Sequence, residues 1–102
     1  MTERKQYLYR IDPSRPEMLS QGMTDEESRV MKQHYEYMQH LLRQGHLILA
    51  GRTQNPDESG FGIVIFEANT DDDAHLIMMN DPAVNLGVMN AWLFPYKVAL
   101  KR

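Results

Sequence analysis

Four short runs of apolar residues are spread along the chain, and each has the length of a single strand. They cover residues 7–11, 47–51, 61–66 and 88–96. Apolar runs of this length between turn-forming residues are typical of strands. Pro95 lies near the end of the last run, where a proline does not interrupt the ladder of a central strand. We therefore predict four strands, the second and third of them joined by a polar hairpin loop.

Between the first two runs, apolar and ring-bearing residues recur three and four positions apart, which predicts an amphipathic helix. These residues are Val30, Met31, His34, Tyr37, Met38, Leu41 and Leu42. Thr24 and Glu27 fit a capping box, so the helix is expected to begin at Thr24 and to end before Gly45. Residues 12–23 contain two prolines, two serines and a glycine. This composition predicts a surface loop before the helix.

A second, narrower apolar stripe follows the third strand. It consists of Ala74, Ile77 and Met78. Thr70 and the acidic residues 71–73 favour the start of a helix at this point. Asp81 is expected to end the helix, because Pro82 pushes the residue before it away from helical dihedral angles.

The resulting order, strand-helix-strand-strand-helix-strand, is that of the ferredoxin-like α+β fold. Because its crossovers are right-handed, both helices are expected on one face of a four-stranded antiparallel sheet. Residues 47–50, 63–66 and 91–94 are apolar at odd and even positions alike, whereas a strand with one face in water alternates apolar and polar residues. We therefore predict a homodimer joined through the helix-free face, unless the assignment of residues to the two faces is wrong by one position.

Composition and charge narrow the function classes. The chain has 102 residues and no cysteine, so we expect one domain over residues 1–102 without disulfides or thiolate metal sites. Its 11 Lys and Arg residues are scattered among 14 Asp and Glu residues, which leaves no basic face for nucleic acid. No apolar stretch has the length of a signal-peptide core or a membrane span. We expect a cytoplasmic protein that binds neither nucleic acid nor membrane.

Motifs that bind phosphates and metals are missing from the sequence. Gly60 and Gly62 lack the third glycine and the following helix of a dinucleotide-binding loop, and the chain has no HExxH motif. His34 and His40 lie on different sides of the predicted helix, so they cannot share a metal ion. We therefore predict neither a metal nor a nucleotide cofactor.

His34 is unusual because it interrupts the apolar stripe of the first helix between Val30 and Met38. A polar ring at this position is expected to be at least partly buried and to need a hydrogen-bond partner. Asp81 is the candidate partner, since its carboxylate would fix the tautomer of the imidazole and raise its basicity. The pair is either a catalytic dyad or a structural hydrogen bond with Asp81 as a turn residue, and the residues alone leave both interpretations open.

Several segments, in order along the chain, resemble the YciI-like (YCII-related) family. They are residues 34–38, 41–45, 47–51, 80–88 and 94–96. The resemblance implies a dimeric α+β barrel without cofactors, and a family dyad of histidine and aspartate that falls on His34 and Asp81. It also implies proton abstraction from a small polar or aromatic substrate, by elimination as in a dehydrochlorinase or by isomerisation.

Two residues depart from the family pattern. Arg52 stands where the family often has proline, and Ala83 where it often has an aromatic residue. We expect Arg52 to anchor an anionic substrate group and Ala83 to open the pocket. Arg10 and Tyr37 are further candidates for substrate binding. The sequence therefore predicts a cofactor-free lyase or isomerase, and the alternative is a non-catalytic dimeric module that binds a small ligand or a protein partner.

Overall fold

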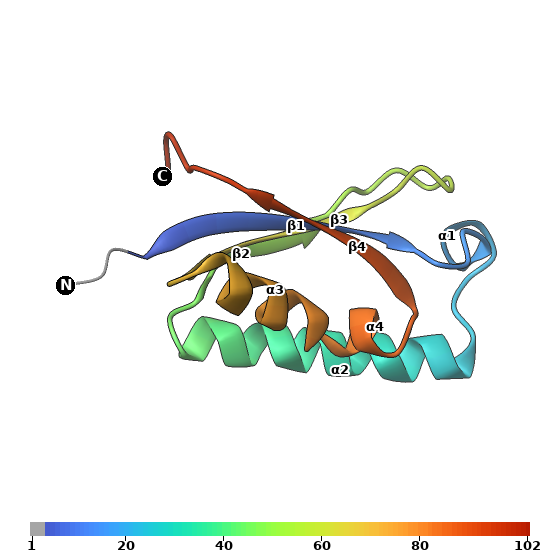
Figure 1. Ribbon diagram of the computed structural model, residues 1–102. Helices are drawn as coiled ribbons and strands as arrows, with labels where there is room; N and C mark the ends of the chain where they lie inside the picture. The colour runs from blue at the N-terminus through green and yellow to red at the C-terminus, as the bar shows by residue number, and fades with distance from the viewer. Residues whose placement is uncertain (1–3) are drawn as a thin grey trace.

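Four strands form one antiparallel sheet in the order β2-β3-β1-β4. The computed structural model describes residues 4–102. Its elements are β1 (Lys5–Pro13), α1 (Glu17–Ser20), α2 (Asp25–Arg43), β2 (Leu47–Arg52), β3 (Gly62–Ala68), α3 (Asp71–Met79), α4 (Pro82–Asn85) and β4 (Met89–Pro95). Figure 1 shows α2, α3 and α4 on one face of this sheet. The ferredoxin-like α+β fold predicted from the sequence is confirmed.

The helix α2 begins and ends where the sequence predicts. The Thr24 hydroxyl accepts a hydrogen bond from the Glu27 N–H, and the Glu27 carboxylate accepts one from the Thr24 N–H. These two bonds complete the capping box. At the other end Gly45 has a φ of 79°, a left-handed conformation that favours glycine directly after a helix.

The apolar stripe of α2 faces inward for most of its length. Its buried members are Val30, Met38 and Leu41, and its half-buried members are Met31, His34 and Tyr37. Leu42 is 59% exposed, so the stripe ends one residue earlier than the sequence predicts. Within residues 4–102, neither this helix nor any other has the length and apolar character needed to cross a membrane.

The segment between β1 and α2 contains the short helix α1, whereas the sequence predicts only a surface loop there. Its Met18 side chain is buried in the core. Arg15 donates to both carboxylate oxygens of Glu27, from Nε at 2.9 Å and from Nη2 at 2.6 Å. This guanidinium, together with the Thr24 N–H, lowers the pKa of Glu27 to about 2. The segment is therefore anchored to the first turn of α2.

Pro82 both follows one helix and begins the next. α3 ends at Met79, as the Asp81-Pro82 step predicts, but Pro82 is also the first residue of α4, which the sequence analysis did not predict. Proline suits this position because the N–H that it lacks would have no partner in the helix. Asp81 is the N-cap of α4, and its carboxylate accepts a hydrogen bond from the Ala83 N–H at 3.0 Å.

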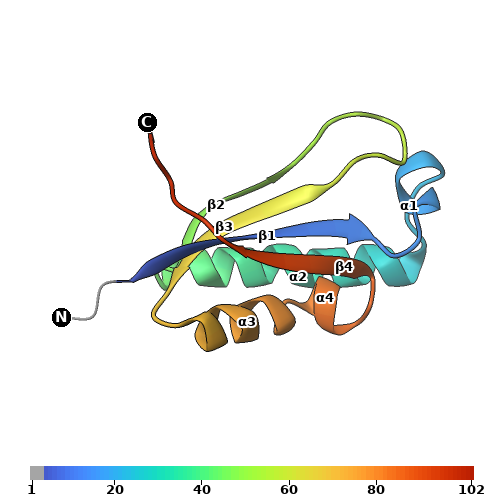
Figure 2. The same ribbon diagram turned by 45° about the horizontal axis from the view of Figure 1, so that its top comes forward.

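Alternation along the strands separates the two faces of the sheet. The buried residues on the helix side are Tyr7, Tyr9, Ile11, Val64, Phe66 and Ala68. On the other face the register places Leu8 beside Phe94 and Arg10 beside Trp92. Trp92 is 46% exposed and Phe94 is 48% exposed. Figure 2 shows that α2, α3 and α4 leave this side of the sheet uncovered, so large apolar side chains remain accessible on it.

Candidate active site

A cavity of about 920 Å³ lies between α2 and the edge strand β2. Side chains of α2 form one wall, and β2 with the beginning of β3 forms the opposite one. Met18 and Leu19 of α1 and residues 53–56 line one end. The Ser20 hydroxyl donates to the Glu58 carboxylate at 2.8 Å, which joins α1 to the loop after β2. The volume is that of a small-molecule site.

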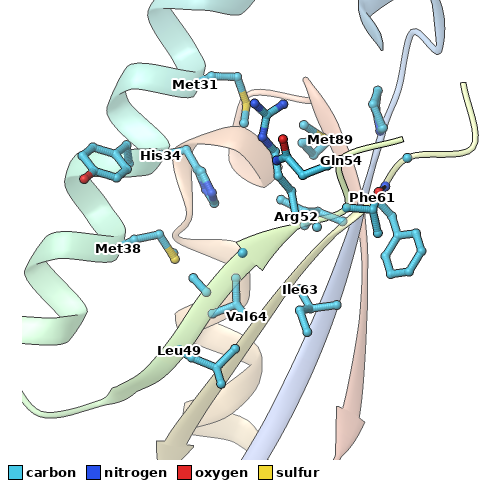
Figure 3. Close-up of a pocket in the computed structure, with 18 of the residues that line it drawn as sticks. Met31, His34, Met38, Leu49, Arg52, Gln54, Phe61, Ile63, Val64 and Met89 are labelled. Atoms are coloured by element: carbon cyan, nitrogen blue, oxygen red, sulfur yellow. Dashed lines mark hydrogen bonds between the residues drawn. The ribbon is translucent and has the colours of Figure 1, made fainter. Parts of the chain in front are cut away.

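His34 extends from α2 into this cavity (Figure 3). Its Nδ1 lies 2.8 Å from both carboxylate oxygens of Asp81. The His34 side chain is only 14% exposed, and Asp81 is fully buried. The structure therefore brings these two residues into direct contact.

The Asp81 carboxylate is surrounded by hydrogen-bond donors. Its Oδ2 accepts from the Tyr9 hydroxyl at 2.7 Å, and its Oδ1 accepts from the Ala83 N–H. Burial and the negative charge of Asp81 raise the pKa of Tyr9, and the same two causes raise the pKa of Tyr37 to about 12. Tyr9 therefore remains a protonated donor, and both oxygens of Asp81 are acceptors.

These bonds determine how the His34 ring is protonated. Because Asp81 acts as an acceptor, the bond between the two side chains requires the proton to be on Nδ1 of His34. In the neutral imidazole, Nε2 then carries a lone pair. Within residues 4–102, Nε2 has no hydrogen-bond partner. The arrangement presents a basic nitrogen to the cavity, with a buried carboxylate behind it.

Arg52 reaches the same cavity from the end of β2 (Figure 3). It pairs with Gly62, and Gly62 pairs with Ile11, which is buried on the helix side of the sheet. Cross-strand neighbours share a face, so Arg52 points to the helix side. A Cβ added to Gly62 would lie 3.0 Å from Ile11 Cγ1. A residue with a side chain would therefore crowd Ile11 at this position of β3, whereas glycine fits.

The structure separates Arg10 and Tyr37 from this cavity. Arg10 lies on the helix-free face, 4.2 Å above the Phe61 ring and 2.9 Å from an Asp12 carboxylate oxygen. The alternation of β1 requires this, because Tyr9 on one side of Arg10 faces the helices. The Tyr37 hydroxyl donates to the Ile77 carbonyl at 2.7 Å, which directs it toward α3.

The expectation that Ala83 opens the pocket is wrong. Ala83 is fully buried in the core and does not line the cavity. Its N–H instead holds the Asp81 carboxylate. Ala83 therefore belongs to the core, where α4 packs against α2, and not to the cavity wall.

Sequence reasoning missed Tyr9 as a member of the site. The available signal was its place in the first strand, since a tyrosine on the core face needs a partner for its hydroxyl. That partner is more than seventy residues away in sequence, so no local pattern identifies it. Within residues 4–102, no group of three or more His, Cys, Asp and Glu side chains is placed to hold a metal ion.

Comparison with known proteins identifies the family. The model of the YCII-related domain matches residues 8–93, so the chain belongs to the YCII-related family. None of the functionally curated proteins matches it in sequence at a significant level.

Two solved structures have a similar fold. One is 5-chloro-2-hydroxyhydroquinone dehydrochlorinase from Burkholderia phenoliruptrix, in complex with 2,5-dihydroxybenzoquinone. It has a TM-score of 0.63 and 19% identity, over 89% of this chain and 93% of that one. The other is an uncharacterized protein from Thermotoga maritima, with a TM-score of 0.58 and 11% identity, over 93% of this chain and 100% of that one. At these identities the likeness supports the fold.

Proposed function

We propose that this protein is a cofactor-free enzyme of the lyase or isomerase type. His34 acts as the general base that removes a proton from a small polar or aromatic substrate in the cavity. The observation that carries the proposal is the bond from Nδ1 of His34 to the buried Asp81 carboxylate. It leaves Nε2 as the nitrogen available to a substrate.

Each residue of the pair has a separate role in this reaction. His34 accepts the proton at Nε2, and Asp81 orients the ring and stabilises the imidazolium that forms. In an elimination, the electron pair of the broken C–H bond forms the new double bond, and the leaving group departs with its own bonding pair. In an isomerisation, the imidazolium returns the proton to a different carbon of the substrate.

Two further observations support this class of reaction. The family is YCII-related, and a solved structure of the same fold is named a dehydrochlorinase, an enzyme that eliminates a chloride. The cavity also lies directly against the imidazole, so a bound molecule can reach Nε2.

The test is a screen for turnover with matched histidine variants. Halogenated hydroquinones, 5-chloro-2-hydroxyhydroquinone first, and halogenated aromatic carboxylates are incubated with wild type, His34→Ala and His40→Ala. We expect His34→Ala to lower kcat by about 10²-fold or more. His40 is exposed on the same helix, so His40→Ala should retain full activity. If His34→Ala folds and keeps its activity, His34 is not the general base. If ligands bind without any turnover, the non-catalytic binding module is the better account.

The helix-free face supports a second proposal, that the chain forms a homodimer through it. Leu49, Trp92 and Phe94 each expose nearly half of their surface there. Large apolar patches of this kind mark interaction surfaces in soluble proteins. A second copy of the same face would cover them symmetrically.

A further inference from the structure

We infer that the substrate is a ring-bearing carboxylate, whose anionic group is bound by Arg52 and whose ring packs against methionine side chains. The inference rests on the proposed function only in naming the bound molecule as a substrate. The binding preference itself follows from the charge and the walls of the cavity, and it can be measured without turnover.

The charges around the cavity favour an anion. The chain as a whole has a net charge of −3, yet within the described residues the cavity lining contains Arg52 and no Lys, Asp or Glu. The nearest carboxylate behind the lining, that of Asp81, is already bonded to His34. Among the described lining residues, Arg52 therefore carries the formal charge, and that charge is positive.

The side chain of Arg52 is available for a ligand. In residues 4–102 its guanidinium forms neither an ion pair nor a hydrogen bond. A guanidinium is planar and donates two parallel hydrogen bonds to a carboxylate, which adds both strength and orientation. Gln54 also lines the cavity (Figure 3), and its amide is a further hydrogen-bond donor.

The apolar part of the cavity favours a flat ring. Five of the eight methionines of the chain line it, namely Met18, Met23, Met31, Met38 and Met89. Thioether sulfurs make favourable contacts with aromatic ring edges, and the flexible side chains adapt to the outline of a ring. Met31 and Met38 flank His34 on α2 (Figure 3), so a ring held between them lies beside the basic nitrogen.

The experiment compares benzoate with benzamide, which have the same ring and differ in charge. Binding is followed in the NMR spectrum through the methyl groups of Met31 and Met38. We expect benzoate to shift both signals and to bind about tenfold or more tightly than benzamide, because a charge-assisted bond replaces a neutral one. Arg52→Met, which keeps an unbranched side chain of similar reach, should remove the difference. Arg10→Met on the opposite face is the control and should preserve it.

Three results would overturn the inference. They are equal binding of the two probes, a preference for benzoate that survives Arg52→Met, and no binding of benzoate or of the larger 2-naphthoate at millimolar concentration. A failure of the proposed function is distinguishable from these results. His34→Gln should abolish turnover while leaving the preference for benzoate intact. In wild type, a preference for benzoate without turnover of any substrate would refute the catalytic role and not the anion site.

Discussion

The Asp81 carboxylate is the group on which the candidate site depends most directly. It is fully buried and accepts hydrogen bonds from Tyr9, Ala83 and His34. A buried carboxylate without such partners costs several kcal/mol, so each donor stabilises the ionised form. Since β1, α2 and α4 each supply or carry one of these donors, the site exists only when the three elements are packed together.

Replacing Tyr9 with Phe removes one donor and keeps the ring in the core. We expect the free energy of unfolding to fall by about 1–3 kcal/mol, because a hydrogen bond to a buried charge is lost, and kcat to fall with it. Chemical denaturation and kinetics measure the two effects. Tyr7→Phe is the matched control, since the Tyr7 hydroxyl donates to Asp71 instead. An unchanged kcat in Tyr9→Phe would contradict a positioning role for Tyr9.

At the scale of single residues, the sequence predicts the pair of His34 and Asp81, but it does not predict the other residues around that pair. The position of His34 between Val30 and Met38 is enough to predict that its ring is largely buried. His34 on α2 and Asp81, the N-cap of α4, then lie on the same face of the sheet. The prediction that Arg10 binds substrate is wrong, because Arg10 lies on the helix-free face and does not line the cavity. The side of the sheet on which it lies follows from Tyr9 and Ile11 being buried, which depends on tertiary packing.

At the scale of elements, the sequence predicts helices that have a helical repeat of apolar residues and a capping residue. It does not predict the shortest helices. α2 has a capping box and a long apolar stripe, and its bounds agree with the prediction. α1 and α4 have only four residues each, too few to show a helical period. A proline can follow the end of one helix or be the first residue of the next. Pro82 does both, because it follows α3 and begins α4.

The ion pair between Arg15 and Glu27 makes the junction of α1 and α2 sensitive to acid. The pair lowers the pKa of Glu27 from its ordinary value of 4.5 to about 2, so it stabilises the fold fully at pH values above about 4.5. The stabilisation is lost as the pH falls from about 4.5 to about 2. Urea denaturation at several pH values measures the effect.

Two variants isolate this contribution. Glu27→Gln should be less stable than wild type at pH 6, and the difference should shrink across the acidic range as wild type loses the pair. Arg15→Met should behave in the same way, because it removes the guanidinium that lowers the pKa of Glu27. A difference between wild type and Glu27→Gln that stays constant down to pH 2 would show that the pair has no pH-dependent role.

At the scale of the whole molecule, helices cover one face of the sheet and leave the other face exposed. One face and its helices hold the core and the cavity, whereas the other exposes Trp92 and Phe94. Apolar residues occupy both odd and even positions of the strands, and this pattern predicts that the helix-free face is apolar too. That a second copy covers this face stays a prediction, because one chain does not contain the interface.

The predicted homodimer is tested by changing the helix-free face. We expect wild type to sediment at twice the chain mass of 11.9 kDa, and Phe94→Glu to sediment at the chain mass, because a charge in the centre of an apolar interface is strongly unfavourable. Leu76 on α3 is also exposed but lies on the helix side, so Leu76→Glu is the control. A monomeric wild type, or a dimer that survives Phe94→Glu, would rule out this interface.

The proposed mechanism requires the neutral His34 ring to carry its proton on Nδ1, which leaves Nε2 as the base for a substrate in the cavity. A long-range ¹H–¹⁵N NMR spectrum of the neutral imidazole reports directly which ring nitrogen carries the proton. We expect a proton on Nδ1 in wild type, and a loss of that strict preference in Asp81→Asn, whose amide has both a donor and an acceptor. A proton on Nε2 in wild type would contradict the account, because that nitrogen would then have no lone pair with which to remove a proton.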